Sequence, residues 1–270
     1  MIRCDVDQYE LARQIKDDEE NYNMDAKYFM EQLMAENIPD YTEWWNNCME
    51  AKKLLDDYDD TEGNKLIKKI SEIIPKNPAI TVDIGQTVCW AAQSLQLKGT
   101  EGRIIIGGSY GAMGVGLPYA IGASISTRNG IVYCITGDGG LQMNIQELET
   151  VKRENLPIKI LVVNNRELGK ISEIQHGSYD DRYIITTENS GYTVPDFVKV
   201  ANAYEIKAAE LENYEELDNY TEWLMDNEPC LLNIMLTPLT QLIPKIKWET
   251  STIKPDIDEK MKEKIDLLLK

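Results

Sequence analysis

Two short polar segments, each directly after a hydrophobic run, contain residue types that could bind a charged ligand. Gly137-Asp138-Gly139-Gly140 follows the run 131–136, and Asn164-Asn165 follows the run 158–163. One carboxylate and one amide oxygen make a poor acid–base pair. They make a good partial shell for a hard cation such as Mg²⁺, which keeps places open for water and phosphate oxygens. Because the glycines after Asp138 let an anion approach the start of a helix, we expect a Mg²⁺-diphosphate site here.

The elements around these segments predict how they come together. The two hydrophobic runs are rich in β-branched residues, which is typical of buried strands, and apolar residues between them recur at helical spacing from Leu141 to Val151. A strand–helix–strand crossover makes the two strands parallel, so both polar segments lie at the edge where open α/β sheets bind ligands. The alternative is an ordinary turn, since Asp-Gly and Asn-Asn are frequent in loops.

Composition excludes several function classes. The chain has 270 residues, 43% of them hydrophobic, and a formal net charge of −18, which disfavours nucleic acid or an anionic membrane as a partner. The five cysteines are scattered without a Cys-x-x-Cys pair, and His176 is the single histidine, so a zinc site or disulfide framework is not expected. No signal peptide and no apolar run of membrane-spanning length is evident, and we expect a cytoplasmic protein.

The remaining pattern predicts an α/β fold. It comprises a doubly wound, mostly parallel sheet with helices on both faces, preceded by a helical N-terminal segment. Strands are predicted at 2–7, 79–84, 103–108 and 230–236, and helices at 64–74, 88–97, 119–126, 195–201 and 215–225. The predicted helix at 195–201 carries Pro195 in its first turn. Residues 56–60 are predicted to form a solvated acidic loop, and residues 244–270 a charged tail that ends in a short helix.

Two further glycine segments could contact a ligand. The strand at 79–84 ends at Gly85-Gln86 before a helix, which makes a second strand–glycine–helix transition and a second possible anion contact. The glycines of 111–118 superficially suggest a dinucleotide fingerprint, but the spacing is imperfect and no acidic residue stands in the ribose-binding position. They could equally permit close helix packing.

Together the motifs resemble the thiamine diphosphate-dependent enzymes of the acetolactate synthase-like family. The resemblance covers about residues 75–240 and rests on several strings in the family's order. These are Val82-Asp83-Ile84-Gly85-Gln86, Trp90-Ala91-Ala92-Gln93, Gly114-Val115-Gly116-Leu117-Pro118, the run from Gly137 to Leu148, and Leu161-Val162-Val163-Asn164-Asn165. The resemblance implies the thiamine diphosphate-binding fold, with thiamine diphosphate and Mg²⁺ as cofactors.

The resemblance also implies roles for particular residues. Asp138 and Asn165 would bind Mg²⁺ through their side chains, and Glu167 through its backbone carbonyl. Met113 would press the aminopyrimidine against the thiazolium in a bent cofactor, and the Gly111 carbonyl would accept a bond from the 4′-amino group. The other implied cofactor-binding residues are Gly85, Gln86, Thr87, Gly137, Gly139, Gly140, Met143 and Ile171.

Three positions depart from the acetolactate synthases within this family. Thr87 stands where those enzymes often have histidine, Lys170 where they have methionine, and Ile174 where they have tryptophan. These changes leave acetolactate synthesis itself open. Lys170 is either a cation that binds an acidic substrate or a surface lysine.

The resemblance implies a lyase or transferase that decarboxylates or ligates 2-keto acids. In the family the site forms between domains of different chains, and an activating glutamate belongs to a pyrimidine-binding domain, so no catalytic residue is assigned here. We expect an oligomer that includes a chain carrying that domain. We divide the sequence into a remnant of a central domain and helical linker (1–74), the thiamine diphosphate/Mg²⁺-binding domain (75–243) and a tail (244–270). The alternatives are a catalytically incomplete cofactor-binding fragment or scaffold, and an NAD-binding domain, which the glycine spacing disfavours.

Overall fold

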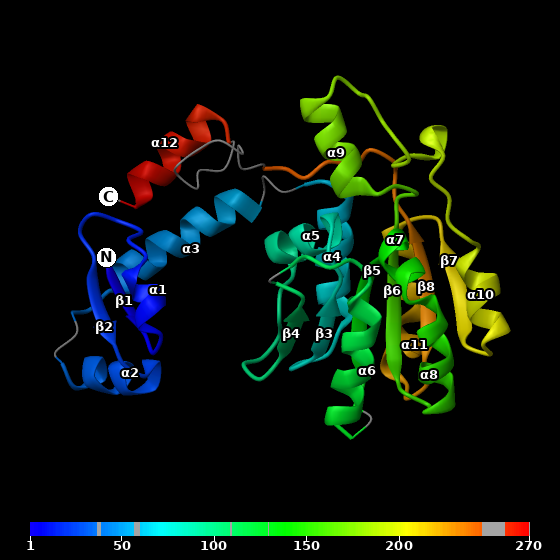
Figure 1. Ribbon diagram of the computed structural model, residues 1–270, viewed down its shortest axis with the longest axis horizontal. Helices are drawn as coiled ribbons and strands as arrows, with labels where there is room; N and C mark the ends of the chain where they lie inside the picture. The colour runs from blue at the N-terminus through cyan, green and yellow to red at the C-terminus, as the bar shows by residue number, and fades with distance from the viewer. Residues whose placement is uncertain (37–38, 57–59, 109, 129, 245–256, 270) are drawn as a thin grey trace. The chain divides into compact units, whose positions relative to one another are not determined.

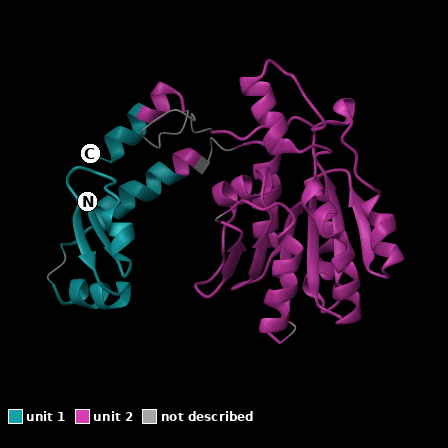
Figure 2. Ribbon diagram, in the orientation of Figure 1, with its two compact units in different colours: residues 1–52, 263–270 teal, residues 53–262 magenta. Residues whose placement is uncertain are grey.

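The computed structural model forms two compact units, residues 1–52 with 263–270 and residues 53–262 (Figure 2). It describes residues 1–270 except 37–38, 57–59, 109, 129, 245–256 and 270. Most of the predicted acidic loop and the first half of the predicted charged tail lie outside the described residues. Helix α12 (Glu259–Leu268) confirms the short helix predicted near the end of the chain.

Unit 1 contains a two-stranded parallel sheet. Strand β1 (Ile2–Asp5) pairs with β2 (Glu20–Asn23). The unit also contains α1 (Gln8–Ala12), α2 (Ala26–Ala35), most of α3 (Thr42–Asp56) and most of α12. Strand β1 was predicted, but β2 was not, because the sequence Glu-Asn-Tyr-Asn has no hydrophobic alternation and all four residues are exposed. Among the described residues of 1–50 none is fully buried, since two strands and short helices enclose little core.

Unit 2 is built on six parallel strands in the spatial order β4-β3-β5-β6-β8-β7 (Figure 1). Their bounds are β3 (Ala79–Val82), β4 (Arg103–Ile106), β5 (Val132–Gly137), β6 (Ile158–Asn164), β7 (Lys207–Leu211) and β8 (Cys230–Met235). All seven residues of β6 are buried, as expected for a central strand covered on both faces.

Helices cover both faces of this sheet, which confirms the predicted doubly wound α/β class. One hydrophobic core contains residues of α4 (Glu62–Ile73), α5 (Gln86–Ser94), η3 (Tyr214–Tyr220) and α11 (Thr221–Met225). The core on the other face contains residues of α6 (Gly116–Ser126), α7 (Asp138–Met143), α8 (Leu148–Arg153) and α10 (Phe197–Ala203). Helix α4 therefore packs into the first of these two cores, although the domain division drawn from the sequence placed it in a linker.

Some predicted elements differ in detail. The single helix predicted between Leu141 and Val151 is broken at Asn144 into α7, the 3₁₀ turn η1 (Ile145–Glu147) and α8. Helix α10 begins at Phe197 because the Asp196 side chain caps it, so Pro195 precedes the helix and is not in its first turn. Strand β7 was missed because Lys-Ala-Ala-Glu-Leu is only partly buried and carries no β-branched residue.

A buried lysine anchors the strand that leads to Asn165. Lys159, near the start of β6, is fully buried, and its ammonium donates to the Asp226 carboxylate at 2.7 Å. Burial raises the pKa of Asp226, but hydrogen bonds from Lys159 and Lys207 outweigh this effect and hold the pKa at about 2. The ion pair therefore fixes β6 at the end opposite to its polar loop.

We expect Asp226→Ala to lower the free energy of unfolding by about 1.5–3 kcal/mol, because it removes the carboxylate that pairs with the buried Lys159 ammonium and leaves that ammonium only the Glu228 carbonyl. Chemical denaturation at pH 7 measures this loss. The double variant Lys159→Met, Asp226→Ala should recover most of it, since both charges are then absent. Equal losses in the single and double variants would contradict the ion-pair account.

Candidate functional site

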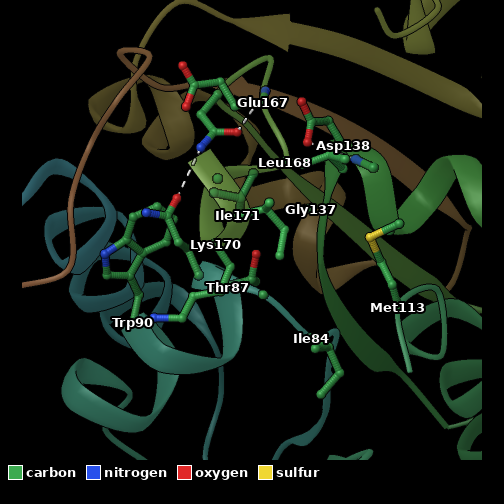
Figure 3. Close-up of a pocket in the computed structure, with 17 residues that line it drawn as sticks. Ile84, Thr87, Trp90, Met113, Gly137, Asp138, Glu167, Leu168, Lys170 and Ile171 are labelled. Atoms are coloured by element: carbon green, nitrogen blue, oxygen red, sulfur yellow. Dashed lines mark hydrogen bonds between the residues drawn. The ribbon is translucent and has the colours of Figure 1, made fainter. Parts of the chain in front are cut away.

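The carboxyl ends of β3, β5 and β6 surround a cavity of about 240 Å³ (Figure 3). It lies where the strand order reverses, because β3 leads to β4 on one side and pairs with β5 on the other. Open α/β sheets bind ligands at this kind of switch point. Its lining comprises Ile84, Gly85, Gln86, Thr87, Trp90, Met113, Gly137, Asp138, Gly139, Gly140, Val163, Asn165, Glu167, Leu168, Gly169, Lys170 and Ile171.

Most residues selected from the sequence lie on this lining. They include all three predicted metal ligands and eight predicted cofactor-binding residues, namely Gly85, Gln86, Thr87, Met113, Gly137, Gly139, Gly140 and Ile171. Two others do not line the cavity. Gly111 lies beside Ile84, whose Cγ2 is 3.9 Å from the position a Gly111 Cβ would take, and Met143 packs against Gly114.

Asp138 is the most unusual group at this edge. It opens α7 directly after β5, it is only 2% exposed, and its Oδ1 accepts the Gly139 N–H at 2.7 Å. No group meets hydrogen-bonding geometry at its buried Oδ2, although the Tyr192 hydroxyl is close enough to lower the pKa of this carboxyl. Burial raises the pKa of this carboxyl to about 7, although backbone N–H groups of Gly139, Arg166 and Glu167 oppose the shift. A buried carboxylate oxygen without a partner is costly, and a carboxylate has acceptor sites enough for both a cation and a hydroxyl donor to satisfy it.

Asn165 is held by a chain of side-chain hydrogen bonds. Its Oδ1 accepts the Glu167 N–H at 3.2 Å, and its Nδ2 donates to the Gln86 Oε1 at 3.2 Å. Gln86 in turn donates from its Nε2 to the Thr240 carbonyl at 2.8 Å. These bonds fix the amide orientation and leave Asn165 Oδ1 one acceptor site for a cation.

Gly169 permits this chain of bonds, and sequence reasoning did not select it. A Cβ on Gly169 would lie 2.1 Å from Gln86 Oε1 and 2.6 Å from Asn165 Nδ2. Any side chain would therefore displace both amides. The only sequence signal was its place at the start of the helix that follows Asn164-Asn165, now observed as α9 (Gly169–Ser178).

The Glu167 side chain faces the protein. Its Oε2 accepts the Ser172 hydroxyl at 2.8 Å, and its Oε1 accepts the Leu239 N–H at 3.2 Å. Burial raises the pKa of this carboxyl. Because both carboxylate oxygens are engaged within the protein, the backbone carbonyl is the group that Glu167 has to offer a cation.

Asp83 positions the glycine loop that carries Met113, a role the sequence did not suggest. It is fully buried and accepts the N–H groups of Gly114 and Gly116 at 2.9 and 3.2 Å and the Thr136 hydroxyl at 3.0 Å. A Cβ on Gly140 would lie 2.7 Å from Asp83 Oδ2, so that glycine is required for packing. The signal, an aspartate at the end of a buried strand, was the same one that identified Asp138.

Three more side chains lie at or near the cavity or were candidates for it. Lys170 lines the cavity, and its ammonium contacts the Glu173 carboxylate at 3.3 Å with 45% of the lysine side chain exposed. His176 is not on the lining and contacts Asp181. Tyr192, absent from the sequence predictions, has a buried hydroxyl without a partner, and the neighbouring Asp138 charge adds to the burial that raises its pKa.

The donor set suits a hard cation and an anion together. Asp138, Asn165 and the Glu167 carbonyl can supply three oxygens, which leaves positions for water and phosphate. Gly85 precedes α5 without a side-chain cap, so free N–H groups of that helix remain at the cavity for an anion. Among the described residues, this site included, no group of three or more His, Cys, Asp or Glu side chains is placed to hold a metal, so the oxygens here come from one carboxylate, one amide and one backbone carbonyl. No helix of the described residues is both long and apolar enough to cross a membrane.

Comparison with known proteins gives one family. Residues 83–234 match the family described as thiamine pyrophosphate enzyme, C-terminal TPP binding domain. The chain is 32% identical to a probable acetolactate synthase large subunit of Methanocaldococcus jannaschii, over 96% of this chain and 48% of that protein. It is 35% identical to the acetolactate synthase isozyme 2 large subunit of Escherichia coli (strain K12), over 67% of this chain and 32% of that protein. The chain thus spans less than half the length of these relatives.

We expect the pH dependence of stability to report the Asp138 environment in metal-free protein. The folded pKa of about 7 lies above the ordinary value of about 3.9, so the folded state holds more protons between these values. Stability from this group is therefore present below pH 4 and declines up to pH 7, by at most about 1.4 kcal/mol per pH unit. Thermal unfolding of the parent and Asp138→Asn should show the variant gaining relative stability from pH 4 to pH 7. A difference that does not vary with pH would contradict the assignment.

Proposed function

The chain belongs to the thiamine pyrophosphate enzymes, and from that premise we propose that its cavity holds thiamine diphosphate through Mg²⁺. The observation that carries the proposal is the buried, partnerless Asp138 Oδ2 beside the oriented Asn165 amide. We propose further that the chain is the diphosphate-binding half of an enzyme that decarboxylates or ligates 2-keto acids.

The metal ligands in this proposal are Asp138, Asn165 and the Glu167 carbonyl. A single carboxylate among neutral oxygens leaves the ion with positive charge, which a diphosphate can neutralise. This arrangement resolves the difficulty that an acidic chain with a net charge of −18 has in binding an anion. Mg²⁺ is therefore part of the proposal and not only thiamine diphosphate.

The remaining lining residues divide into anion donors and apolar walls. Gly85, Gln86 and Gly139 would present backbone N–H groups to the diphosphate, with Thr87 and Gly137 beside them. Met113 and Ile171 would contact the cofactor rings and exclude water from them. When bound, thiamine diphosphate would supply a nucleophilic carbon that adds to the keto group and a thiazolium ring that takes up the electron pair left by decarboxylation.

The proposals for the substrate and for the partner chain depend on the names of the relatives and on how much of them the chain covers. The two relatives described above are named acetolactate synthase large subunits, which supports a 2-keto acid substrate and an oligomeric assembly for this chain. Since the alignment covers less than half of them, we propose that another chain supplies the pyrimidine-binding domain with its activating glutamate. The scattered cysteines, free in the described residues, support a cytoplasmic location.

One observation favours a second candidate, a cofactor-binding fragment or scaffold without activity of its own. The carboxylates on the cavity lining belong to Asp138 and Glu167. One is assigned to the metal and the other is hydrogen-bonded within the protein. The lining therefore offers no spare carboxylate for proton transfer. Turnover of a 2-keto acid when a chain with the pyrimidine-binding domain is added would decide for the enzyme.

We expect Asp138→Ala to abolish Mg²⁺-dependent thiamine diphosphate binding while the protein stays folded, because the variant removes the only charged metal ligand. Calorimetric titration with and without Mg²⁺ measures binding, and circular dichroism checks the fold. Asp181→Ala, which removes an exposed carboxylate outside the cavity lining, is the matched control and should bind like the parent. Unchanged binding by Asp138→Ala would reject the metal assignment.

Met113→Ala should separate ring contacts from diphosphate contacts. We expect weaker binding of thiamine diphosphate, by about 10-fold for the lost apolar contact, and unchanged Mg²⁺-dependent binding of inorganic pyrophosphate. Competition between the two ligands measures both affinities in one experiment. A parallel loss for pyrophosphate would place Met113 in the diphosphate site and contradict its assigned role.

A further inference from the structure

Two of the buried polar atoms that lack a partner lie at the same place. In the described part of the chain, three buried side-chain polar atoms have no hydrogen-bond partner, and these are Trp90 Nε1, Asp138 Oδ2 and the Tyr192 hydroxyl. Each such atom is costly, so native structures contain few of them. Asp138 and Tyr192 meet at Gly139, whose N–H donates to Asp138 Oδ1 and whose missing Cβ would contact the Tyr192 hydroxyl. A carboxylate and a hydroxyl are complementary groups, and their shared lack of a partner indicates a bond that completes with the ligand in place.

A rigid turn presents Tyr192 to the site. The Thr187 carbonyl accepts the N–H groups of both Ser190 and Tyr192, each at 3.0 Å. The Ser190 hydroxyl accepts the N–H of Thr186 at 3.0 Å and that of Thr187 at 2.9 Å. Gly191 supplies the left-handed residue of this turn, with φ of 103°. The aromatic ring is therefore carried by a turn with its backbone groups engaged and not by an open loop.

The same turn is joined to the loop that carries the metal ligands. Glu167 and Thr187 form an antiparallel bridge, and the Leu168 N–H donates to the Thr186 carbonyl at 2.9 Å. The Tyr192 hydroxyl lies only 2.9 Å from the position that a Cβ on Gly139 would take. Tyr192 thus reaches the residue next to Asp138 while its backbone is coupled to Glu167.

We propose that Tyr192 is a positioning residue for the cation, whose hydroxyl donates a hydrogen bond to Asp138 Oδ2 and fixes the carboxylate for metal binding. The inference rests on the proposed Mg²⁺-diphosphate function and adds a residue outside the ligands. Tyr192 is not on the cavity lining, but its hydroxyl lies beside the lining residue Gly139. With Gly139 N–H on Oδ1 and Tyr192 on Oδ2, both oxygens keep lone pairs for the ion, because a carboxylate has about four acceptor sites.

The inference predicts a defect in metal affinity without a defect in folding. Partners of metal ligands orient them, and loss of such a partner typically lowers metal affinity about 10- to 100-fold. Tyr192→Phe removes the hydroxyl and keeps the ring. We expect the Mg²⁺ concentration that half-saturates thiamine diphosphate binding to rise by about that factor. The melting temperature of the metal-free variant should stay the same or rise, since a buried hydroxyl without a partner is removed.

The matched control is another buried tyrosine hydroxyl in the same unit. Tyr133 donates to the Leu224 carbonyl at 2.9 Å and is not on the cavity lining. Tyr133→Phe should lower the metal-free melting temperature and leave the Mg²⁺ requirement unchanged. The two variants therefore have opposite expected signatures.

The test titrates thiamine diphosphate at stepwise Mg²⁺ concentrations into the full chain, with calorimetry as the readout. A parent that shows no Mg²⁺-dependent binding refutes the proposed function itself. If the parent binds, a Tyr192→Phe half-saturation within twofold of the parent overturns the inference alone. A Tyr192→Phe loss of melting temperature like that of Tyr133→Phe also overturns it, because the hydroxyl would then act structurally.

Discussion

A carboxylate that is buried with one oxygen unpaired is the constraint on which the site depends. Desolvation disfavours the charged form of Asp138, and neighbouring N–H groups offset only part of the cost. A fold that served stability alone would place a neutral residue here. In the proposed function, the strand order, the glycines and the hydrogen-bonded amides around Asp138 hold this carboxylate in place for a cation.

The parallel sheet brings the proposed metal ligands together. Gly137 of β5 lies opposite Val163 of β6, so the two strands end side by side and Asp138 comes next to Asn164-Asn165. Because β5 and β6 are central and fully covered, the register between them is fixed by burial on both faces. The ion pair of Lys159 holds the opposite end of β6. Site geometry is therefore a consequence of core packing.

The sequence predicted those site residues whose positions follow from the local pattern of strands and helices. Asp138 and Asn165 follow hydrophobic runs in consecutive strands of one βαβ unit, so their meeting followed from handedness and strand direction alone. Tyr192 and Gly169 escaped notice because their roles come from contacts with distant backbone and side chains. Strands β2 and β7 were missed for a related reason, since neither has the alternation or β-branched content that marks a strand.

The most direct test is a crystal structure of this chain with thiamine diphosphate and Mn²⁺, whose anomalous scattering locates the ion. The account predicts one strong peak within bonding distance of an Asp138 oxygen, the Asn165 Oδ1 and the Glu167 carbonyl, with diphosphate oxygens completing the shell. A folded protein with bound cofactor and the ion held elsewhere, or with no ion between these oxygens, would contradict it.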